Sequence, residues 1–320
     1  MKAVHKLSLF LSLLALSLST STFAVSCGDV IDSPTNLDQD LVCVLDEQNK
    51  VALTVVGPSG RLNLGGYAIT CVTDQAFDRF GILVEGAGAA ISGGMISNCP
   101  DSITVSGTGV HRVTDTEIVN FTGNGIIATS DSNKNYITRV TATGAGPDSN
   151  DGIRIDGNYS TVANCFIFNA GDRGIVINGN HVNIYDNYVT GSINEGIEID
   201  GDFVTTKLNA IENNGKGIGV SGNNNSVIEN TVINNGSGLS FNNADNGLIA
   251  KNEILDNGSY GIQIVSIEAT NNKFIGNRVL GHTKFNLYDP LTTKDCNLSN
   301  RSPNIWANNE SSSSSPGCLD

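Results

Sequence analysis

Apolar and polar residues alternate in short runs along this chain, and many of these runs begin with a glycine. Six glycines between positions 152 and 264 are each followed by apolar residues at the first and third positions, and the steps between them are nearly constant at about 22 residues. They are Gly152, Gly174, Gly196, Gly217, Gly238 and Gly261. An apolar spacing of two predicts strands rather than helices. A repeat of this length built from strands predicts a solenoid.

A second strand is predicted about ten residues before each of these glycines. It follows an Asn-x-apolar pattern, read at Asn187-x-Val189 and, in the preceding unit, at Asn164-x-Phe166. The same pattern recurs at Asn209, Asn230, Asn252 and Asn277. Asparagine tolerates left-handed turn conformations and can hydrogen-bond the equivalent asparagine above and below. We therefore expect an asparagine ladder beside columns of inward-pointing aliphatic side chains.

The same signature extends the repeat towards the N-terminus at Gly81 and Gly125, and one coil carries an insertion near residues 145–150. A leucine-rich horseshoe has a similar period, but its units require several leucines at fixed places, and this chain offers Ile and Val instead. With three short strands per turn, residues 40–290 predict about ten or eleven coils and a rod on the order of 50 Å long.

The two ends are predicted to be caps. Residues 27–64 contain short strands between Gly-rich turns, and regular stacking is expected from Ala68 onwards. The pattern breaks again near Phe285, and the Ser-rich segment 311–320 is expected to be a tail. Solenoids need covered ends because an open coil exposes unpaired strand edges.

Residues 1–24 are interpreted as a signal peptide. They combine a basic start, an apolar run and the small-x-small sequence Thr22-Phe23-Ala24, which leaves residues 25–310 as the mature domain. No later stretch reaches membrane-spanning length, so we expect a secreted monomer without a transmembrane segment. The sequence Ala24-Val25-Ser26-Cys27 leaves lipid attachment at Cys27 as an alternative.

The net negative charge of the chain limits the classes of molecule that it is expected to bind. The full chain carries a formal net charge of −14, and losing Lys2 and Lys6 with the signal peptide brings it to −16. Such a surface repels nucleic acid and anionic membranes and suits cation binding. An acidic polysaccharide would need bridging calcium ions or local Arg and Lys side chains.

Seven cysteines in an exported chain predict disulfides with one thiol left over. Cys71 and Cys99 occupy matching sequence contexts, each at the same distance after a Gly-Gly pair, so they should lie on neighbouring coils. Strands about 4.8 Å apart fall within the range that a disulfide spans. Cys165 remains as a buried free thiol. The other predicted disulfide cysteines flank the first and last segments: Cys27 and Cys43, and Cys296 and Cys318.

The alternation of Gly-Ile-x-Ile with Asn-x-Val resembles the right-handed parallel β-helix proteins of the pectin-lyase-like superfold. The start of the mature chain, from Cys27-Gly28-Asp29 through Leu62-Asn63-Leu64-Gly65-Gly66, resembles the first coil of exported members. The resemblance covers nearly the whole mature chain and implies an all-β, right-handed parallel β-helix with two caps. It leaves the activity open, because this superfold hosts lyases, hydrolases, epimerases and adhesins.

The phase of the repeat gathers charge on one outer face over three successive coils. Residues between the inward aliphatics, or just outside them, should stack in outward columns. These columns contain Asp151, Arg154, Asp156, Arg173, Glu195, Glu198 and Asp200. The stack Asp151–Arg173–Glu195–Lys216 alternates in sign, so an ordinary solubilising ladder is the alternative interpretation.

Pectate-lyase-like enzymes of this fold hold calcium with Asp and Glu and use Arg or Lys as a base. The resemblance implies that Arg173 or Arg154 is the catalytic base. Asp151 and Glu195, in the same outward columns, are candidate substrate contacts. The resemblance also implies calcium ligands, whose oxygen chemistry suits that ion. These ligands would be Asp156, Glu198 and Asp200.

Three functional hypotheses follow. The leading hypothesis is a secreted protein that binds an extracellular or cell-wall polysaccharide, and the second is a calcium-dependent polysaccharide lyase or uronate epimerase. The third is a structural or surface-display rod without a ligand. The chain lacks the Gly-His-Gly motif of hydrolases of this fold and the Asp-Pro-His motif of alginate epimerases.

Overall fold

A computed structural model describes residues 24–74, 78–291, 303–317 and 319. All but the last residue of the predicted signal peptide, and both Cys296 and Cys318, lie outside the described residues. The described part consists almost entirely of short strands, and its one helical turn is the 3-10 turn Gly146–Asp148 in the predicted insertion. No helix in these residues is long and apolar enough to cross a membrane.

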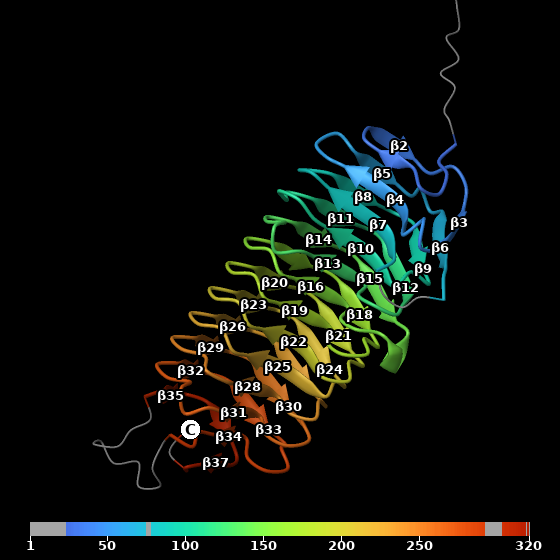
Figure 1. Ribbon diagram of the computed structural model, residues 1–320. Helices are drawn as coiled ribbons and strands as arrows, with labels where there is room; N and C mark the ends of the chain where they lie inside the picture. The colour runs from blue at the N-terminus through green and yellow to red at the C-terminus, as the bar shows by residue number, and fades with distance from the viewer. Residues whose placement is uncertain (1–23, 75–77, 292–302, 318, 320) are drawn as a thin grey trace, which may run out of the picture.

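Each coil contributes one strand to each of three parallel sheets, which we name sheets A, B and C in chain order (Figure 1). Sheet A contains β1 (Val30–Ile31), β4 (Val51–Val56), β7 (Phe80–Glu85), β10 (Asp101–Val105), β13 (Ile126–Ala128), β16 (Ile153–Ile155), β19 (Ile175–Ile177), β22 (Glu195–Ile199), β25 (Lys216–Val220), β28 (Leu239–Phe241), β31 (Ile262–Ile264), β34 (Leu287–Tyr288) and β37 (Ser314–Ser315). Sheet B contains β2 (Pro34–Asn36), β5 (Arg61–Asn63), β8 (Ala90–Ser92), β11 (Arg112–Thr114), β14 (Tyr136–Thr138), β17 (Thr161–Ala163), β20 (Asn183–Tyr185), β23 (Thr205–Lys207), β26 (Ser226–Ile228), β29 (Leu248–Ala250), β32 (Lys273–Ile275) and β35 (Ile305–Ala307). Sheet C contains β3 (Leu41–Val44), β6 (Ala68–Val72), β9 (Met95–Ser97), β12 (Glu117–Phe121), β15 (Thr141–Gly144), β18 (Phe166–Phe168), β21 (Tyr188–Thr190), β24 (Ala210–Glu212), β27 (Thr231–Ile233), β30 (Glu253–Leu255), β33 (Arg278–Leu280) and β36 (Glu310–Ser311).

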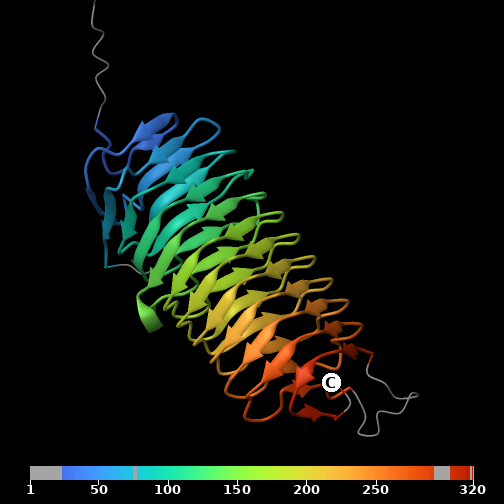
Figure 2. The ribbon, with the colours of Figure 1, turned by 180° about the vertical axis from the view of Figure 1, so that it is seen from behind.

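The result is a straight rod in which every coil pairs with the coils before and after it (Figure 2). Sheets B and C each hold 12 strands, so the described residues form about 12 coils. Residues 40–290 supply 11, 10 and 11 strands to sheets A, B and C, in agreement with the ten or eleven coils predicted for that range. At about 4.8 Å per coil the rod is roughly 55 Å long.

Both predicted caps take part in the stacking. Val30 of β1 pairs with Thr54 of β4, so the coils begin near Val30 rather than at Ala68. At the other end, Leu287 pairs with Ser314, which places part of the Ser-rich segment inside sheet A rather than in a separate tail. Both segments lack the Gly-Ile signature but still supply strands in register.

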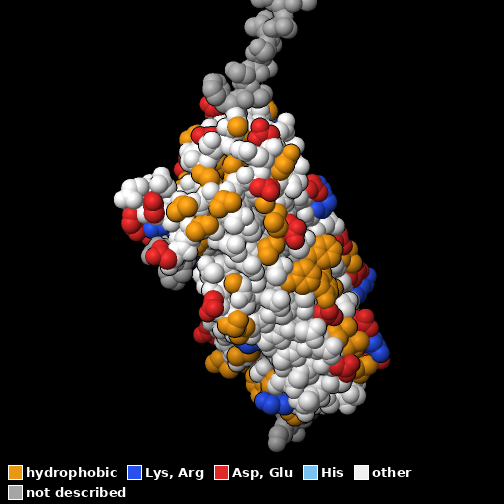
Figure 3. Space-filling model, turned by 90° about the vertical axis from the view of Figure 1, so that its right-hand side faces the viewer, with side chains coloured by type: hydrophobic (Ala, Val, Ile, Leu, Met, Phe, Trp, Pro, Cys, Tyr) orange, Lys and Arg blue, Asp and Glu red, His pale blue; other side chains and the backbone are white. Residues whose placement is uncertain are grey.

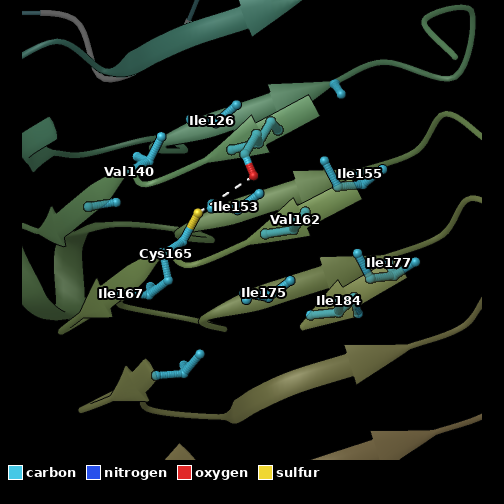
Figure 4. Close-up of a cluster of buried hydrophobic side chains, with 14 of the residues drawn as sticks. Ile126, Val140, Ile153, Ile155, Val162, Cys165, Ile167, Ile175, Ile177 and Ile184 are labelled. Atoms are coloured by element: carbon cyan, nitrogen blue, oxygen red, sulfur yellow. Dashed lines mark hydrogen bonds between the residues drawn. The ribbon is translucent and has the colours of Figure 1, made fainter. Parts of the chain in front are cut away.

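The core is a set of aliphatic columns enclosed by the three sheets, part of which Figure 4 shows around Ile153 and Ile175. The glycine of the repeat has a steric cause. A Cβ atom added at Gly174 would overlap a methyl group of Val189, and one added at Gly217 would overlap a methyl group of Val232. Sheets A and C therefore meet too closely at this corner for any larger residue.

A ladder of buried asparagines joins the coils at the corner between sheets B and C. Asn209 accepts hydrogen bonds from the backbone N–H and the side-chain amide of Asn187, at 3.0 and 2.9 Å. Its own amide donates to Asn230 and to the carbonyl of Ile184. The ladder consists of Asn187, Asn209, Asn230, Asn252, Asn277 and Asn309.

The predicted register of the preceding unit is wrong by one residue. Phe166 pairs with Tyr188, so Cys165, and not Asn164, occupies the ladder position, where its N–H donates to Asn187. Asn164 lies exposed at a φ of 55°. The Cys165 thiol donates to the carbonyl of Ala163 at 3.3 Å, and burial raises its pKa to about 11. Cys165 is thus the buried free thiol that the sequence predicts (Figure 4).

Two disulfides fasten the first coils. The Cys71–Cys99 bond predicted from the stacking register is present, with Cα atoms 4.9 Å apart. Cys27 bonds to Cys43. This second bond uses the thiol that lipid attachment at Cys27 would require, so the alternative of a lipid anchor there is wrong.

Candidate functional site

Six charged side chains on the outer surface of sheet A form one connected network, which we call the Arg173 cluster. Its members come from three successive coils and lie on β16, β19 or β22 or within three residues of one of these strands. They are Asp151, Arg154, Asp156, Asp172, Arg173 and Glu198. Four carboxylates and two guanidiniums leave an excess of two negative charges.

Arg173 lies at the centre of the cluster and binds carboxylates from three coils. Its Nε donates to Asp151 Oδ1 at 3.0 Å, and a terminal nitrogen lies 3.2 Å from Asp172. The other terminal nitrogen donates to Glu198 on the next coil. Partial burial works against the charge of Arg173, but the carboxylates outweigh it and raise the pKa of the guanidinium. Arg173 is therefore firmly protonated.

Asp151 forms the floor of the cluster. It is only 1% exposed, and Arg154 approaches it from its own coil at 3.9 Å, in addition to Arg173. Burial raises the pKa of the Asp151 carboxyl, although both arginines favour its charged form. Arg154 in turn donates to Asp156 at 3.0 Å. A nearly buried carboxylate between two arginines is costly unless those contacts are held in place.

Glu198 is the carboxylate that Arg173 binds on the following coil. Burial raises the pKa of Glu198, the Arg173 side chain lowers it, and the nearby charge of Asp200 adds to the rise. Perturbed carboxyl groups on a surface are more common at functional sites than elsewhere, although structural ion networks also produce them.

The alternating-sign ladder predicted for this face is interrupted. Lys216 does pair with Glu195, at 2.7 Å, but Arg173 extends to Glu198 rather than to Glu195. The four residues therefore form two separate pairs, Arg173 with Asp151 and Lys216 with Glu195, instead of one continuous stack. Val176 lies between two inward aliphatics, a position that the repeat predicts to face solvent, but it is only 1% exposed. It lies in register between the long side chains of Arg154 and Glu198.

The proposed calcium ligands do not gather around one point. No group of three or more His, Cys, Asp or Glu side chains in the described part of the chain is arranged to hold a metal ion. Asp156 accepts a hydrogen bond from Arg154, and Glu198 accepts one from Arg173. Asp200 lies exposed outside the cluster. These residues do not fit calcium as a set.

The insertion precedes Asp151 in the chain and is bonded to the following coil. The hydroxyl of buried Ser149 accepts a hydrogen bond from Gly171 N–H at 2.7 Å, and the carbonyl of Asn150 accepts one from Asp172 N–H. These bonds hold the insertion against the coil that carries Arg173. In Figure 1 it projects from the rod beyond the strands of sheet C.

The sequence did not predict a group of aromatic side chains on the outer face of sheet C, which we call the aromatic platform: Phe166, Phe168 and Tyr188. The rings of Phe166 and Phe168 lie 6.4 and 5.9 Å from the Tyr188 ring. Figure 3 shows an apolar patch on this side of the rod with charged side chains along one edge. The one-residue error at Asn164 concealed the platform, because it placed Phe166 in the core. An alignment of Cys165 with Asn187 would have predicted that Phe166 and Phe168 point outward.

A family model described as a right handed beta helix region matches residues 173–316. Together with the three continuous parallel sheets, this match decides the fold. The protein is a right-handed parallel β-helix. No curated protein matches the β-helix chain in sequence.

Solved structures share this architecture at low identity. The periplasmic alginate epimerase AlgG is 14% identical with a TM-score of 0.63, over 80% of the β-helix chain and 72% of its own. The A-module of a mannuronan C-5 epimerase from Azotobacter vinelandii is 14% identical with a TM-score of 0.54, over 81% and 84%. The Dettilon tailspike protein is 17% identical with a TM-score of 0.57, over 85% and 60%. At these identities the similarity shows the fold alone.

Proposed function

We propose that this β-helix protein is secreted and binds an extracellular polysaccharide across the outer face of sheet A, at the Arg173 cluster. The observation that supports this most directly is the arrangement of the cluster itself. Arg173 holds carboxylates of three coils at one place, and its side chain remains 23% exposed while that of Arg154 is 34% exposed.

The chemistry of the cluster suits a ligand with many hydroxyl groups. A carboxylate offers about four lone-pair positions and a guanidinium five N–H donors, so the ion pairs leave part of this capacity unused. A polysaccharide chain running along the rod would meet donors and acceptors on successive coils. Because the ion pairs already fix these groups, little side-chain entropy would be lost on binding.

Two further observations agree with this proposal. The disulfides fit an oxidising compartment outside the cytoplasm. Two of the structurally similar proteins are named as epimerases of alginate or mannuronan, which are polysaccharides.

Binding of immobilised alginate, polygalacturonate and a neutral β-glucan, measured by biolayer interferometry, tests the proposal. We expect saturable binding of at least one polymer, and we expect Arg154→Ala and Glu198→Gln each to weaken it about tenfold, the effect of losing roughly 1.4 kcal/mol. Arg278→Ala is the matched control, because Arg278 pairs with Glu253 and Glu310 on the outer face of sheet C. Absence of saturable binding to all three polymers, or an equal loss in the control, would overturn the proposal.

A lyase or epimerase acting on a uronate polymer is the second candidate. The raised pKa values of Asp151 and Glu198, which belong to one partly exposed cluster, favour it. Arg173 is a poor base because its pKa is raised, so in this version Arg173 would bind the substrate carboxylate and a carboxylate of the cluster would move the proton. Absorbance of unsaturated products from polygalacturonate or alginate detects a lyase, and solvent-proton exchange at the sugar ring detects an epimerase. If neither signal is present while binding persists, the enzyme hypothesis fails.

A further inference from the structure

We propose that the aromatic platform on sheet C is a second carbohydrate-binding surface, which takes a neutral oligosaccharide. It lies on a different sheet from the Arg173 cluster, on two of the coils that also carry the cluster. This inference rests on the proposed function and extends it, because it assigns a separate surface to the same protein.

The platform leaves three aromatic rings at the surface of the rod. Phe166 is 50% exposed, and Phe168 and Tyr188 are partly exposed. The rings are tilted by 48° and 55° to one another rather than stacked flat, so their faces are not completely covered by each other. The apolar C–H face of a pyranose ring packs well against such aromatic surfaces, which bury a large area per side chain.

The residues that pair with the two phenylalanines of the platform on neighbouring coils include three threonines, which carry hydroxyl groups. Thr141 pairs with Phe166, and Thr143 and Thr190 pair with Phe168 on either side. On the following coil the small residue Ala210 pairs with Tyr188 and leaves room beside the ring. Hydroxyl groups can donate and accept hydrogen bonds, as sugar hydroxyls do. Apolar faces with a few directed polar groups are typical of sites for small organic ligands.

The Tyr188 hydroxyl fixes the central ring of the platform. It donates a hydrogen bond to Glu212 on the next coil. This bond sets the tilt of Tyr188 and provides a carboxylate acceptor beside the ring. Among the residues in direct register with the three rings there is no cation, so a neutral sugar fits this surface better than a uronate does.

The surface on either side of the platform is hollowed, which suits an elongated ligand. One hollow, of about 780 Å³, is lined by Met95, Glu117, Arg139 and Thr141, and Thr141 adjoins Phe166. A second, of about 450 Å³, is lined by Pro147, Asn169 and Ile193, and Asn169 directly follows Phe168. An oligosaccharide resting on the platform could extend into either hollow. The coil spacing of about 4.8 Å is comparable with the length of one sugar unit.

Isothermal titration calorimetry of the full mature chain with cellohexaose, mannohexaose and xylohexaose tests the inference. We expect at least one hexasaccharide to bind saturably, and Phe166→Ala to weaken that binding about tenfold, as truncation of a central aromatic contact commonly does. Tyr188→Phe, which keeps the ring, should weaken it less than Tyr188→Ala. Phe203→Ala is the matched control, because Phe203 is also a 50% exposed phenylalanine but lies between sheets A and B, stacked on His181.

Three outcomes would overturn the inference. They are no saturable binding of any of the three hexasaccharides, an equal loss in Phe203→Ala, or a dimer in sedimentation velocity that Phe166→Ala abolishes. The last outcome would assign the platform to contact between two copies of the chain. Arg154→Ala separates the two proposals, since it should leave hexasaccharide binding unchanged. If Arg154→Ala weakens polymer binding but Phe166→Ala does not weaken hexasaccharide binding, only the platform proposal is contradicted. If Phe166→Ala weakens hexasaccharide binding but Arg154→Ala does not weaken polymer binding, only the sheet A proposal is contradicted.

Discussion

The buried asparagines of the ladder hold successive coils together by hydrogen bonds made entirely within the protein. Each interior asparagine of the ladder accepts two hydrogen bonds from the asparagine before it and donates to the one after it. It also donates to a backbone carbonyl of the preceding coil, as Asn209 does to Ile184. Removing one such residue leaves several buried partners without a hydrogen bond, and each of them carries a desolvation cost.

We therefore expect Asn209→Ala to lower the free energy of unfolding by about 2–4 kcal/mol. Asn183→Ala is the control, because Asn183 is an exposed residue of β20. Chemical denaturation monitored by circular dichroism gives both values. Equal, small effects of the two substitutions would contradict the role assigned to the ladder.

The Arg173 cluster predicts a pH dependence of stability. Burial raises the pKa of Glu198 above its ordinary value of 4.5, against the opposing effect of Arg173. A carboxyl group with a raised pKa in the folded state binds more protons there than in the unfolded state. Its contribution to stability is complete below the ordinary pKa and is lost as the pH rises through the raised value.

The free energy of unfolding of the wild type, relative to that of Glu198→Gln, should therefore fall as the pH increases from about 4 towards 7. Denaturation curves at several pH values measure this difference. Glu268→Gln, which alters an exposed carboxylate far along the chain, serves as the control. A difference that stays constant over this range would show that Glu198 does not titrate in the expected way.

At the scale of strands and corners, the repeated glycine marks the closest approach of sheets A and C. Gly219 lies on β25 of sheet A, whereas Gly174 directly precedes β19 of that sheet. A Cβ added at Gly219 would point outward and come no closer than 3.3 Å to the flexible side chain of Glu195. At Gly174 the added atom would overlap Val189 in the core. The same substitution should therefore have different consequences at the two positions.

We expect Gly174→Ala to destabilise the protein by about 1–3 kcal/mol, the range typical of overpacked cores. Gly219→Ala should be close to neutral. Thermal unfolding of the two variants provides the comparison. Similar losses at both positions would mean that the glycines serve backbone flexibility rather than close packing.

The sequence predicts the regular elements well, because the nearly constant period of the glycines leaves only one way to stack the coils. The parallel sheets, the Cys71–Cys99 bond and the insertion near residue 146 all followed from that period. The first coil was interpreted as a cap because β1, β2 and β3 carry no glycine signature. Their place in the sheets comes from backbone pairing, which any extended segment can provide.

The candidate site was predictable only as a set of outward positions. The phase of the repeat placed Asp151, Arg154, Arg173 and Glu198 on one face, and the structure brings them together. The sequence could not predict which carboxylates Arg173 binds. Its long side chain can reach either Glu195, at the equivalent position of the next coil, or Glu198, three residues further along the chain. The aromatic platform was missed because Asn164 imitates the ladder asparagine one position too early.

At the scale of the whole molecule, each coil contacts only its two neighbours, and the end coils contact one. Stability in such a protein is the sum of the coils and of the interfaces between them. We expect amide hydrogen exchange to be slowest in β16, β19 and β22 and to become faster towards β35 and β36. Mass spectrometry of exchanged peptides tests this gradient. Uniform protection from end to end would indicate a single cooperative unit.

The direction of the backbone hydrogen bonds has a mechanical consequence. In all three sheets they connect one coil to the next and so run along the rod axis. A force applied to the last residues of the chain would peel off one coil at a time, because only one interface carries the load. A ligand attached to a side face over several coils would instead distribute the load over many interfaces in shear. Such a rod should therefore withstand a force applied to its side face far better than a force that unwinds it from one end.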